Sequence, residues 1–107
     1  MRRGEIRWYT FRAPDKRRPV LILTRDDVID SVNELIVAPA TRTVRGIVTE
    51  VRLTAEDGMP TECALNFDHV ALAQRSNLGS LLTRLRVERW TEIRSALLSA
   101  CGFPLPR

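Results

Sequence analysis

Residues 16–24 read Lys16-Arg17-Arg18-Pro19-Val20-Leu21-Ile22-Leu23-Thr24, so three cations stand directly before an unbroken apolar run. The four apolar residues show no polar alternation, and Val20 and Ile22 are β-branched. This pattern predicts a strand that is covered on both faces. We therefore expect the sheet of this protein to be built around residues 20–23.

The residues in front of this strand form the first candidate site. Pro19 suits the first position of a strand, where its missing N–H removes no ladder bond, and it biases Arg18 to an extended backbone. Arg18 is then expected on a stiff edge, where its guanidinium stays charged and offers paired planar donors to a phosphate. Lys16 and Arg17 are more simply explained as solvated loop charges.

The composition predicts one soluble globular domain over residues 1–107, with 44% apolar and 28% charged residues. The net charge of +4 favours an anionic partner, either nucleic acid or an acidic protein. No signal-peptide core follows Arg3 and no run approaches a membrane span, so we expect a cytoplasmic protein without membrane contact. Cys63 and Cys101 are predicted to be two buried free thiols.

Residues 5–11 alternate as a first strand, with Ile6 and Trp8 on one face and Arg7, Tyr9 and Phe11 on the other. For Trp8 and Tyr9 we favour core packing over base stacking. Residues 12–17 are expected to form a loop, and residues 25–32 a short helix. Residues 35–39 resume as a strand whose Pro39 implies an edge or a bulge, so residues 40–43 are expected to leave the sheet at an irregular point.

The second half of the chain predicts three more strands and a helix. Residues 47–54 alternate as a half-buried strand, residues 63–70 place Asn66 and Asp68 opposite the core side, and residues 81–85 form a last strand. Apolar residues recur at helical spacing from Val87 until Gly102 supplies a stop, and residues 103–107 are expected to be a loose tail. Five or six short strands and few helices predict a mainly β fold, a small partly open β-barrel with one C-terminal helix packed on it.

The inventory of reactive side chains excludes several kinds of enzyme. His69 is the only histidine, so a pair of imidazoles cannot act as acid and base, and the two distant cysteines cannot complete a zinc site. No glycine-rich phosphate loop and no Gly-x-Ser-x-Gly elbow occurs. One reaction fits what remains: attack of an RNA 2′-hydroxyl on its neighbouring phosphate, which needs only alignment, charge stabilisation and proton transfer.

Five pieces of the chain, in this order and spacing, resemble the MazF/PemK toxins of bacterial toxin–antitoxin pairs, which are sequence-specific endoribonucleases. They are residues 3–6, 18–23, 37–41, 46–51 and 67–70. The resemblance implies an SH3-like barrel, a homodimer whose RNA groove crosses the subunit interface, and a cognate MazE-like antitoxin. It also implies cleavage of single-stranded RNA without a metal or cofactor, leaving a 2′,3′-cyclic phosphate and a 5′-hydroxyl.

Carried over to this sequence, the resemblance makes Arg18 the essential arginine and Thr41 the essential threonine. Arg18 would clamp the phosphate and Thr41 would hydrogen-bond it. Where many relatives have a longer loop with a glutamate, this chain has Asp15, for which we favour no role. The candidates for contact with RNA are Lys16, Arg17, Arg42, Thr43, Arg45, Asp68, His69 and Arg84. The lysine and the arginines among them are also explained as solvated charges, and His69 as a structural histidine.

Two other functions remain open from the sequence. CcdB-type toxins share the fold and poison DNA gyrase, but they depend on a C-terminal Trp-Gly-Ile, whereas this chain ends in Leu105-Pro106-Arg107. A non-catalytic RNA-binding module would use the same basic residues without cutting. The cleavage sequence, the class of RNA cut and the general base are not encoded in any recognisable pattern.

Overall fold

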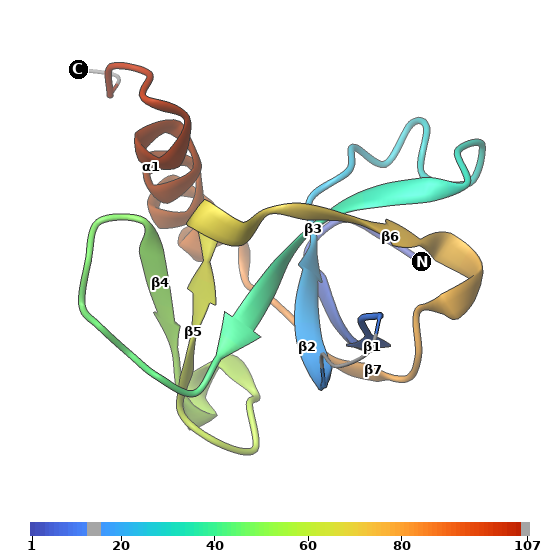
Figure 1. The fold of residues 1–107 in the computed structure, drawn as a ribbon, viewed down its shortest axis with the longest axis horizontal. Coiled ribbons are helices and arrows are strands. Elements are labelled where there is room, and N and C mark those ends of the chain that lie inside the picture. The colour runs from blue at the N-terminus through green and yellow to red at the C-terminus, as the bar shows by residue number, and fades with distance from the viewer. Residues whose placement is uncertain (13–15, 106–107) are drawn as a thin grey trace.

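A computed structural model describes residues 1–12 and 16–105 of the chain. Within them, seven strands and one α-helix follow in the order β1 (Glu5–Thr10), β2 (Arg17–Ile22), β3 (Glu34–Thr41), β4 (Glu50–Leu53), β5 (Cys63–Asn66), β6 (Ala71–Gln74), β7 (Leu81–Arg84) and α1 (Trp90–Cys101). The strands form one antiparallel sheet in the order β4-β5-β3-β2-β1-β7, with β6 paired to β3. Figure 1 shows the sheet curled into a half-barrel with α1 beside β4 and β5. The predicted mainly β, partly open barrel with a C-terminal helix is confirmed, although the strands number seven rather than five or six.

Strand β2 is central and covered on both faces, as its apolar run predicts. It pairs with β1 on one side and β3 on the other. Leu21 and Leu23 belong to one core cluster, and Val20 and Ile22 belong to a second cluster on the opposite face. Because successive strand residues point to opposite faces, one unbroken apolar run supplies both cores.

Pro19 is the third residue of β2 and not the first, so its predicted position is wrong. Hydrogen-bonded pairs alternate along an antiparallel ladder. The N–H of Leu23 donates to the Ile36 carbonyl at 2.8 Å, so the next hydrogen-bonded pair is Leu21–Ala38 and the one after it would be Pro19–Ala40. Proline has no N–H to donate. The β2–β3 pairing accordingly ends at Val20–Pro39, one position earlier.

Strand β3 then continues without β2. Pro39 does not mark an edge, because Ala40 and Thr41 stay in β3 and pair with Leu65 and Ala64 of β5 on its other side. The expectation that residues 40 and 41 leave the sheet is wrong. These two residues no longer pair with β2, but they pair with β5. Past Pro39, β3 therefore diverges from β2 while the sheet remains intact.

Several other boundaries differ from the sequence prediction. Residues 26–31 form successive turns rather than a helix. In one of these turns the Ile29 N–H donates a hydrogen bond to the Asp26 carbonyl, three residues earlier, at 3.4 Å. The strand predicted over residues 47–54 is confined to β4, since Ile47 and Val48 are exposed in the preceding loop. Strand β6 had no sequence prediction.

The strand predicted over residues 63–70 ends at Asn66. The Asn66 side chain accepts the Asp68 N–H at 3.0 Å and caps a 3₁₀ turn over Phe67–His69. Asparagine favours such a local bond over continuation of a ladder. All four residues of β5 are buried, so this strand has no exposed polar face.

The C-terminal helix is confirmed, with Gly102 ending it in the left-handed conformation at φ 77°. Its Ile93 and Ala96 pack in the cluster that contains Leu21. Both cysteines are free, but Cys101 is exposed on α1 and only Cys63 is buried, so the prediction of two buried thiols is half wrong. Helix α1 is too short to cross a membrane, and the remainder of the described chain contains no apolar helix of that length.

Candidate functional site

The divergence of β2 from β3 opens a hollow of about 430 Å³, here called the larger hollow. Its walls come from the start of β2, the end of β3 and the loop before β5. The lining residues are Trp8, Lys16, Arg17, Arg18, Pro19, Ala40, Thr41, Arg42, Thr43, Met59, Pro60, Thr61 and Cys63. Its position follows from the proline that stops the ladder.

A second hollow of about 190 Å³, here called the smaller hollow, adjoins the first. The two share Arg18, Ala40, Thr41 and Thr43. The smaller hollow is further lined by Pro39, Arg45, Glu50, Asn66 and His69. Arg18 and Thr41 thus stand where the two hollows meet, which is the arrangement that a shared phosphate site requires.

The side chains of Arg18 and Thr41 both have donors to spare. Thr41 Oγ1 accepts the Thr43 N–H at 3.2 Å, which leaves the hydroxyl proton available. Arg18 is half-buried, and its guanidinium makes no hydrogen bond or ion pair with residues 1–12 or 16–105. A charged fork and a hydroxyl facing one hollow are suited to an oxyanion.

Trp8 belongs to the wall of the larger hollow, so our preference for core packing is wrong for this residue. The Arg17 guanidinium lies over its ring, 4.5 Å from the ring centre. Tyr9, in contrast, packs against the cluster that contains Val20, as preferred. The partly exposed indole adds a flat apolar surface to a basic hollow.

The larger hollow is strongly positive. Lys16, Arg17, Arg18 and Arg42 line it, and none of its lining residues within the described ranges is a carboxylate. Arg45 adds a cation to the smaller hollow, where Glu50 is the acid. Such clustering favours a polyanion over a single small anion.

Asn66 and His69 form one polar edge of the smaller hollow. Because Asn66 Oδ1 accepts the Asp68 N–H, its Nδ2 faces His69 Nδ1, 3.5 Å away. An amide N–H at this place favours the His69 tautomer whose Nδ1 accepts and whose proton is on Nε2. In that tautomer the second ring nitrogen of His69 is an N–H donor.

Glu50 was not predicted as a site residue, since the alternation of its strand assigned it to the solvent face. Its Oε1 accepts the N–H groups of Arg45 and Gly46, at 2.9 and 3.1 Å. The carboxylate thereby fixes the loop that carries Arg45. Only the fold of that loop over β4 reveals the contact.

Two predicted RNA contacts lie outside both hollows. Asp68 accepts the Thr49 hydroxyl at 2.7 Å, which is a structural bond. Arg84 lies on β7 at the far edge of the sheet, 3.5 Å from Glu5. The other candidates, Lys16, Arg17, Arg42, Thr43, Arg45 and His69, line one or both hollows, whereas Asp15 falls outside the described residues.

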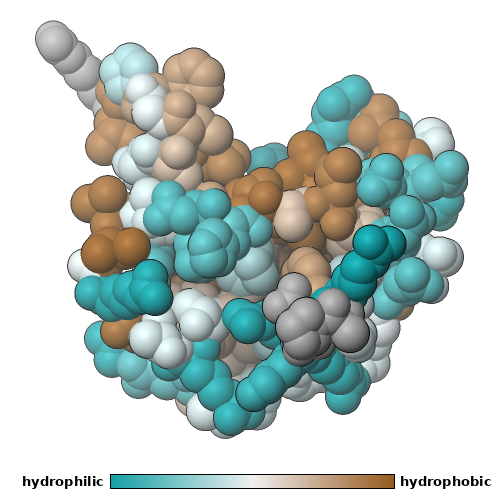
Figure 2. Space-filling view, viewed as in Figure 1, coloured by the Kyte–Doolittle hydropathy of each residue, from teal (hydrophilic) through white to brown (hydrophobic). Residues whose placement is uncertain are grey.

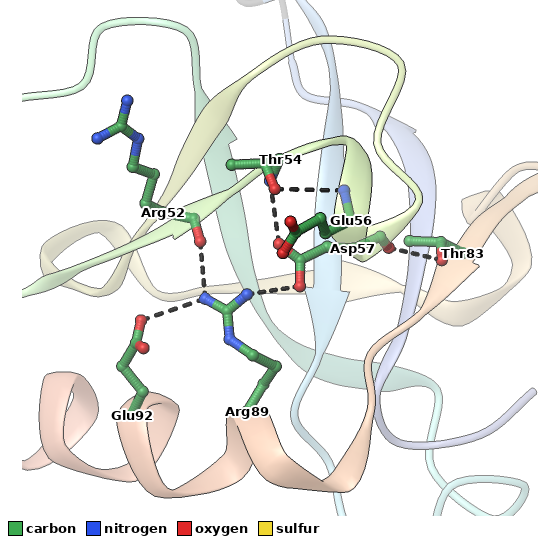
Figure 3. Close-up of polar contacts among 7 residues, drawn as sticks. All are labelled: Arg52, Thr54, Glu56, Asp57, Thr83, Arg89 and Glu92. Atoms are coloured by element: carbon green, nitrogen blue, oxygen red, sulfur yellow. Dashed lines mark hydrogen bonds and ion pairs between the residues drawn. The ribbon is translucent and has the colours of Figure 1, made fainter.

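The wall formed by residues 59–61 is anchored by a cluster drawn in Figure 3. Asp57 accepts the Thr54 N–H at 3.0 Å and the Arg89 guanidinium at 2.5 Å, and Arg89 also donates to the Arg52 carbonyl at 2.7 Å. Gly58 follows at φ 87°, where a Cβ would collide with Thr83 Oγ1. The cluster ties the start of α1 to the turn that leads into the larger hollow.

The larger hollow contains a thiol, but not a nucleophile. Burial raises the pKa of Cys63, and the nearby carboxylates of Asp57 and Glu62 raise it further. A neutral thiol is a weak nucleophile. Among residues 1–12 and 16–105 there is also no group of three or more His, Cys, Asp or Glu side chains placed to hold a metal ion.

Known proteins resemble the chain over nearly its whole length. Residues 2–100 match the family of PemK-like, MazF-like toxins of type II toxin–antitoxin systems. The probable endoribonuclease MazF2 of Mycobacterium tuberculosis is 41% identical over 103 residues, which are 95% of this chain and 99% of the relative.

Solved structures show the same fold. The Mycobacterium tuberculosis toxin MazF-mt6 superposes with a TM-score of 0.86 at 31% identity, covering 94% of this chain and 98% of the toxin. A MazE–MazF crystal structure from Deinococcus radiodurans gives a TM-score of 0.79 at 26% identity, over 97% of this chain and 98% of the matched chain.

Proposed function

The chain belongs to the PemK-like, MazF-like toxin family of type II toxin–antitoxin systems. We propose that it cuts single-stranded RNA, with Arg18 and Thr41 as its catalytic residues. Endoribonuclease activity agrees with the name of a relative 41% identical over 95% of the chain. The observation that carries the assignment of the site is that Arg18 and Thr41 line both hollows.

The reaction we propose uses the nucleophile of the substrate. The ribose 2′-oxygen bonds to phosphorus while the bond from phosphorus to the 5′-oxygen breaks, giving a 2′,3′-cyclic phosphate and a 5′-hydroxyl. One proton leaves the 2′-oxygen and one is gained by the 5′-oxygen. The tethered nucleophile makes orientation the main requirement, so no metal is needed to generate it.

Arg18 and Thr41 supply the charge stabilisation. The guanidinium donates to phosphoryl oxygens on which negative charge increases in the transition state, and the Thr41 hydroxyl donates to the same group. Arg18 lies next to Pro19, and Thr41 is held in a β-ladder with Ala64. Donors fixed in this way need little reorganisation when charge develops.

The rest of the groove binds the strand. Lys16, Arg17 and Arg42, which line the larger hollow, would neutralise phosphates on that side, and Arg45 would do so at the smaller hollow. Trp8 offers a ring on which a base can stack. This combination of cations and an aromatic platform is typical of sites for single-stranded nucleic acid.

Two protein partners are part of the proposal. A cognate MazE-like antitoxin would lay an acidic segment across the basic hollows, in keeping with the MazE–MazF structure from Deinococcus radiodurans. A second copy of the chain would cover the apolar surface over β3 and β6 in Figure 2, where Ile36 and Leu72 lie opposite each other and are 45% and 57% exposed. We also place this toxin in the cytoplasm, where RNA and antitoxin would meet it.

The test is cleavage of a single-stranded RNA in EDTA, with mass spectrometry of the fragment ends. We expect cutting to persist, to leave cyclic-phosphate ends, and to stop when the ribose on the 5′ side of the cut is replaced by its 2′-deoxy form. Cutting that requires added metal, or that continues at the deoxy position, would rule out the mechanism. Binding without any cutting would leave only an RNA-binding module.

A further inference from the structure

His69 is an exposed residue of the smaller hollow that has no part in the reaction proposed for Arg18 and Thr41. It ends the 3₁₀ turn Phe67–His69, which the Asn66 side chain caps where β5 stops. The residue lines the same hollow of about 190 Å³ as Arg18 and Thr41. Its imidazole is therefore accessible to a substrate that binds at these two residues.

Only one nitrogen of the imidazole has a polar neighbour within residues 1–12 and 16–105. His69 Nδ1 lies 3.5 Å from Asn66 Nδ2, and Nε2 makes no hydrogen bond there. Asn66 Oδ1 accepts the Asp68 N–H, so the amide nitrogen, which is a donor, is the atom that meets the ring. The favoured neutral tautomer accepts at Nδ1 and keeps its proton on Nε2. The unoccupied nitrogen of the ring is thus a hydrogen-bond donor.

Three kinds of RNA acceptor are available to this donor: a phosphoryl oxygen, an acceptor on a base, and the ribose 2′-oxygen. A bond donated to the 2′-oxygen would draw electron density from the nucleophile and oppose its attack. A base contact would not depend on the hollow that His69 shares with the two residues assigned to the phosphate. A phosphate has two non-bridging oxygens with several lone pairs, so it can accept from Arg18, Thr41 and His69 at once.

The contact with Asn66 also disfavours proton transfer by His69. A general base needs a lone pair on the nitrogen that meets the substrate, whereas Nε2 carries a proton in the favoured tautomer. Loss of that proton would leave an imidazolate, so the neutral ring is not a general acid either. What remains for the ring is to donate a hydrogen bond and keep its proton.

We propose that His69 is a third catalytic residue, whose neutral Nε2–H donates a hydrogen bond to a non-bridging oxygen of the scissile phosphate. This inference rests on the proposed function and adds a donor to the same site. Negative charge on that oxygen increases as the 2′-oxygen attacks, so the bond is strongest in the transition state. Asn66 acts as a positioning residue, because the hydrogen bond at Nδ1 sets which nitrogen keeps the proton.

Two substitutions of His69 distinguish a donor from an acid or base. His69→Gln keeps an N–H donor, and His69→Ala removes it. We expect the single-turnover rate of RNA cleavage to fall by about tenfold or more in His69→Ala. In His69→Gln the rate should stay within about threefold of the wild-type rate, with an unchanged pH dependence. Asn77→Ala, at the end of another exposed 3₁₀ turn, is the matched control and should cut normally.

Equal rates for His69→Ala and the wild type would overturn the inference. Equal losses in His69→Ala and His69→Gln would overturn it as well, because they would assign the ring to proton transfer. Circular dichroism of each variant separates these outcomes from a loss of fold.

Sulfur substitution tests the contact with the phosphate itself. Each non-bridging oxygen of the scissile phosphate is replaced in turn by sulfur, a weaker acceptor, and the loss of rate is compared between the wild type and His69→Ala. We expect one diastereomer to lose less in the variant, because the bond is already missing. Equal losses in both proteins, or losses in His69→Ala that depend on the neighbouring base, would overturn the inference. A wild-type protein that cuts no RNA at all would instead remove the proposed function, and this inference with it.

Discussion

Arg18 and Thr41 are each two residues along the chain from the last residue pair that joins β2 to β3. Val20 and Pro39 are that final pair, Arg18 is two residues before Val20, and Thr41 is two residues after Pro39. In an uninterrupted ladder they would stand directly opposite and share a face. The missing donor of Pro19 ends the ladder between them, so the register aligns the two side chains while the gap admits a ligand.

Replacing Arg18 by lysine tests whether the planar fork matters or only the charge. We expect Arg18→Lys to lower the single-turnover rate of RNA cleavage by about 10²-fold or more, because lysine keeps the charge but loses the paired donors. The matched control is Arg94→Lys on the exposed side of α1, which should cut normally. Equal rates for Arg18→Lys and wild type would contradict the role of the guanidinium, provided that circular dichroism shows both folded.

Substitutions of Thr41 test whether cleavage depends on its hydroxyl group or only on the shape of its side chain. Thr41→Val keeps the volume but removes the donor, and the Thr43 N–H loses its acceptor. We expect its cleavage rate to fall by about 10²-fold, with Thr41→Ser retaining most activity. A valine variant as active as serine, measured on the same RNA, would show that the hydroxyl does not contact the phosphate.

Trp8 tests the stacking surface. We expect Trp8→Ala to weaken binding of an uncleavable 2′-deoxy oligonucleotide by about 1–3 kcal/mol and Trp8→Phe to weaken it much less. Trp90→Phe removes the only other tryptophan, so quenching of the remaining indole on titration reports on Trp8 directly. No quenching at saturating oligonucleotide would exclude contact between Trp8 and the bases.

The Asp57–Arg89 pair predicts an acid-dependent loss of stability. Burial raises the pKa of Asp57, but the Thr54 N–H and the Arg89 guanidinium lower it more, so the net pKa lies below its ordinary value of 3.8. A depressed folded-state pKa stabilises the protein above pH 3.8, and this contribution is lost as the pH falls through the lower folded value.

Arg89→Met should therefore reduce the free energy of unfolding by about 3 kcal/mol at pH 7, because it leaves a buried carboxylate without its partner. The deficit should shrink as the pH is lowered toward 3 in urea titrations. Arg52→Met breaks the exposed ion pair with Glu62 and should cost less than about 1 kcal/mol. A deficit for Arg89→Met that is independent of pH would show that the pair is not its source.

Short sequence patterns correctly predicted the strands and the helix whose burial can be inferred from the order of apolar and polar residues within the element itself. The apolar run of residues 20–23 identified the central strand, because a strand without polar residues must be covered on both faces. Helical spacing followed by Gly102 identified α1 in the same way. The turns at residues 26–31 were predicted to be a helix, because Val28, Ile29 and Val32 have helical spacing. Three apolar residues at that spacing occur in successive turns as well as in a helix, so the spacing alone does not distinguish the two.

The sequence by itself determined the barrel, the central strand and the candidates Arg18 and Thr41, because these depend on hydrophobic pattern and a family resemblance. Only the tertiary structure decided that the β2–β3 pairing ends at Val20–Pro39, that Trp8 lines a hollow, and that Arg84 lies at a distant edge. Register and strand partners arise from contacts between residues far apart in the chain, which no local pattern records. The hydrogen bonds that Glu50 accepts from Arg45 and Gly46 belong to the same class, because they depend on the loop that folds over β4.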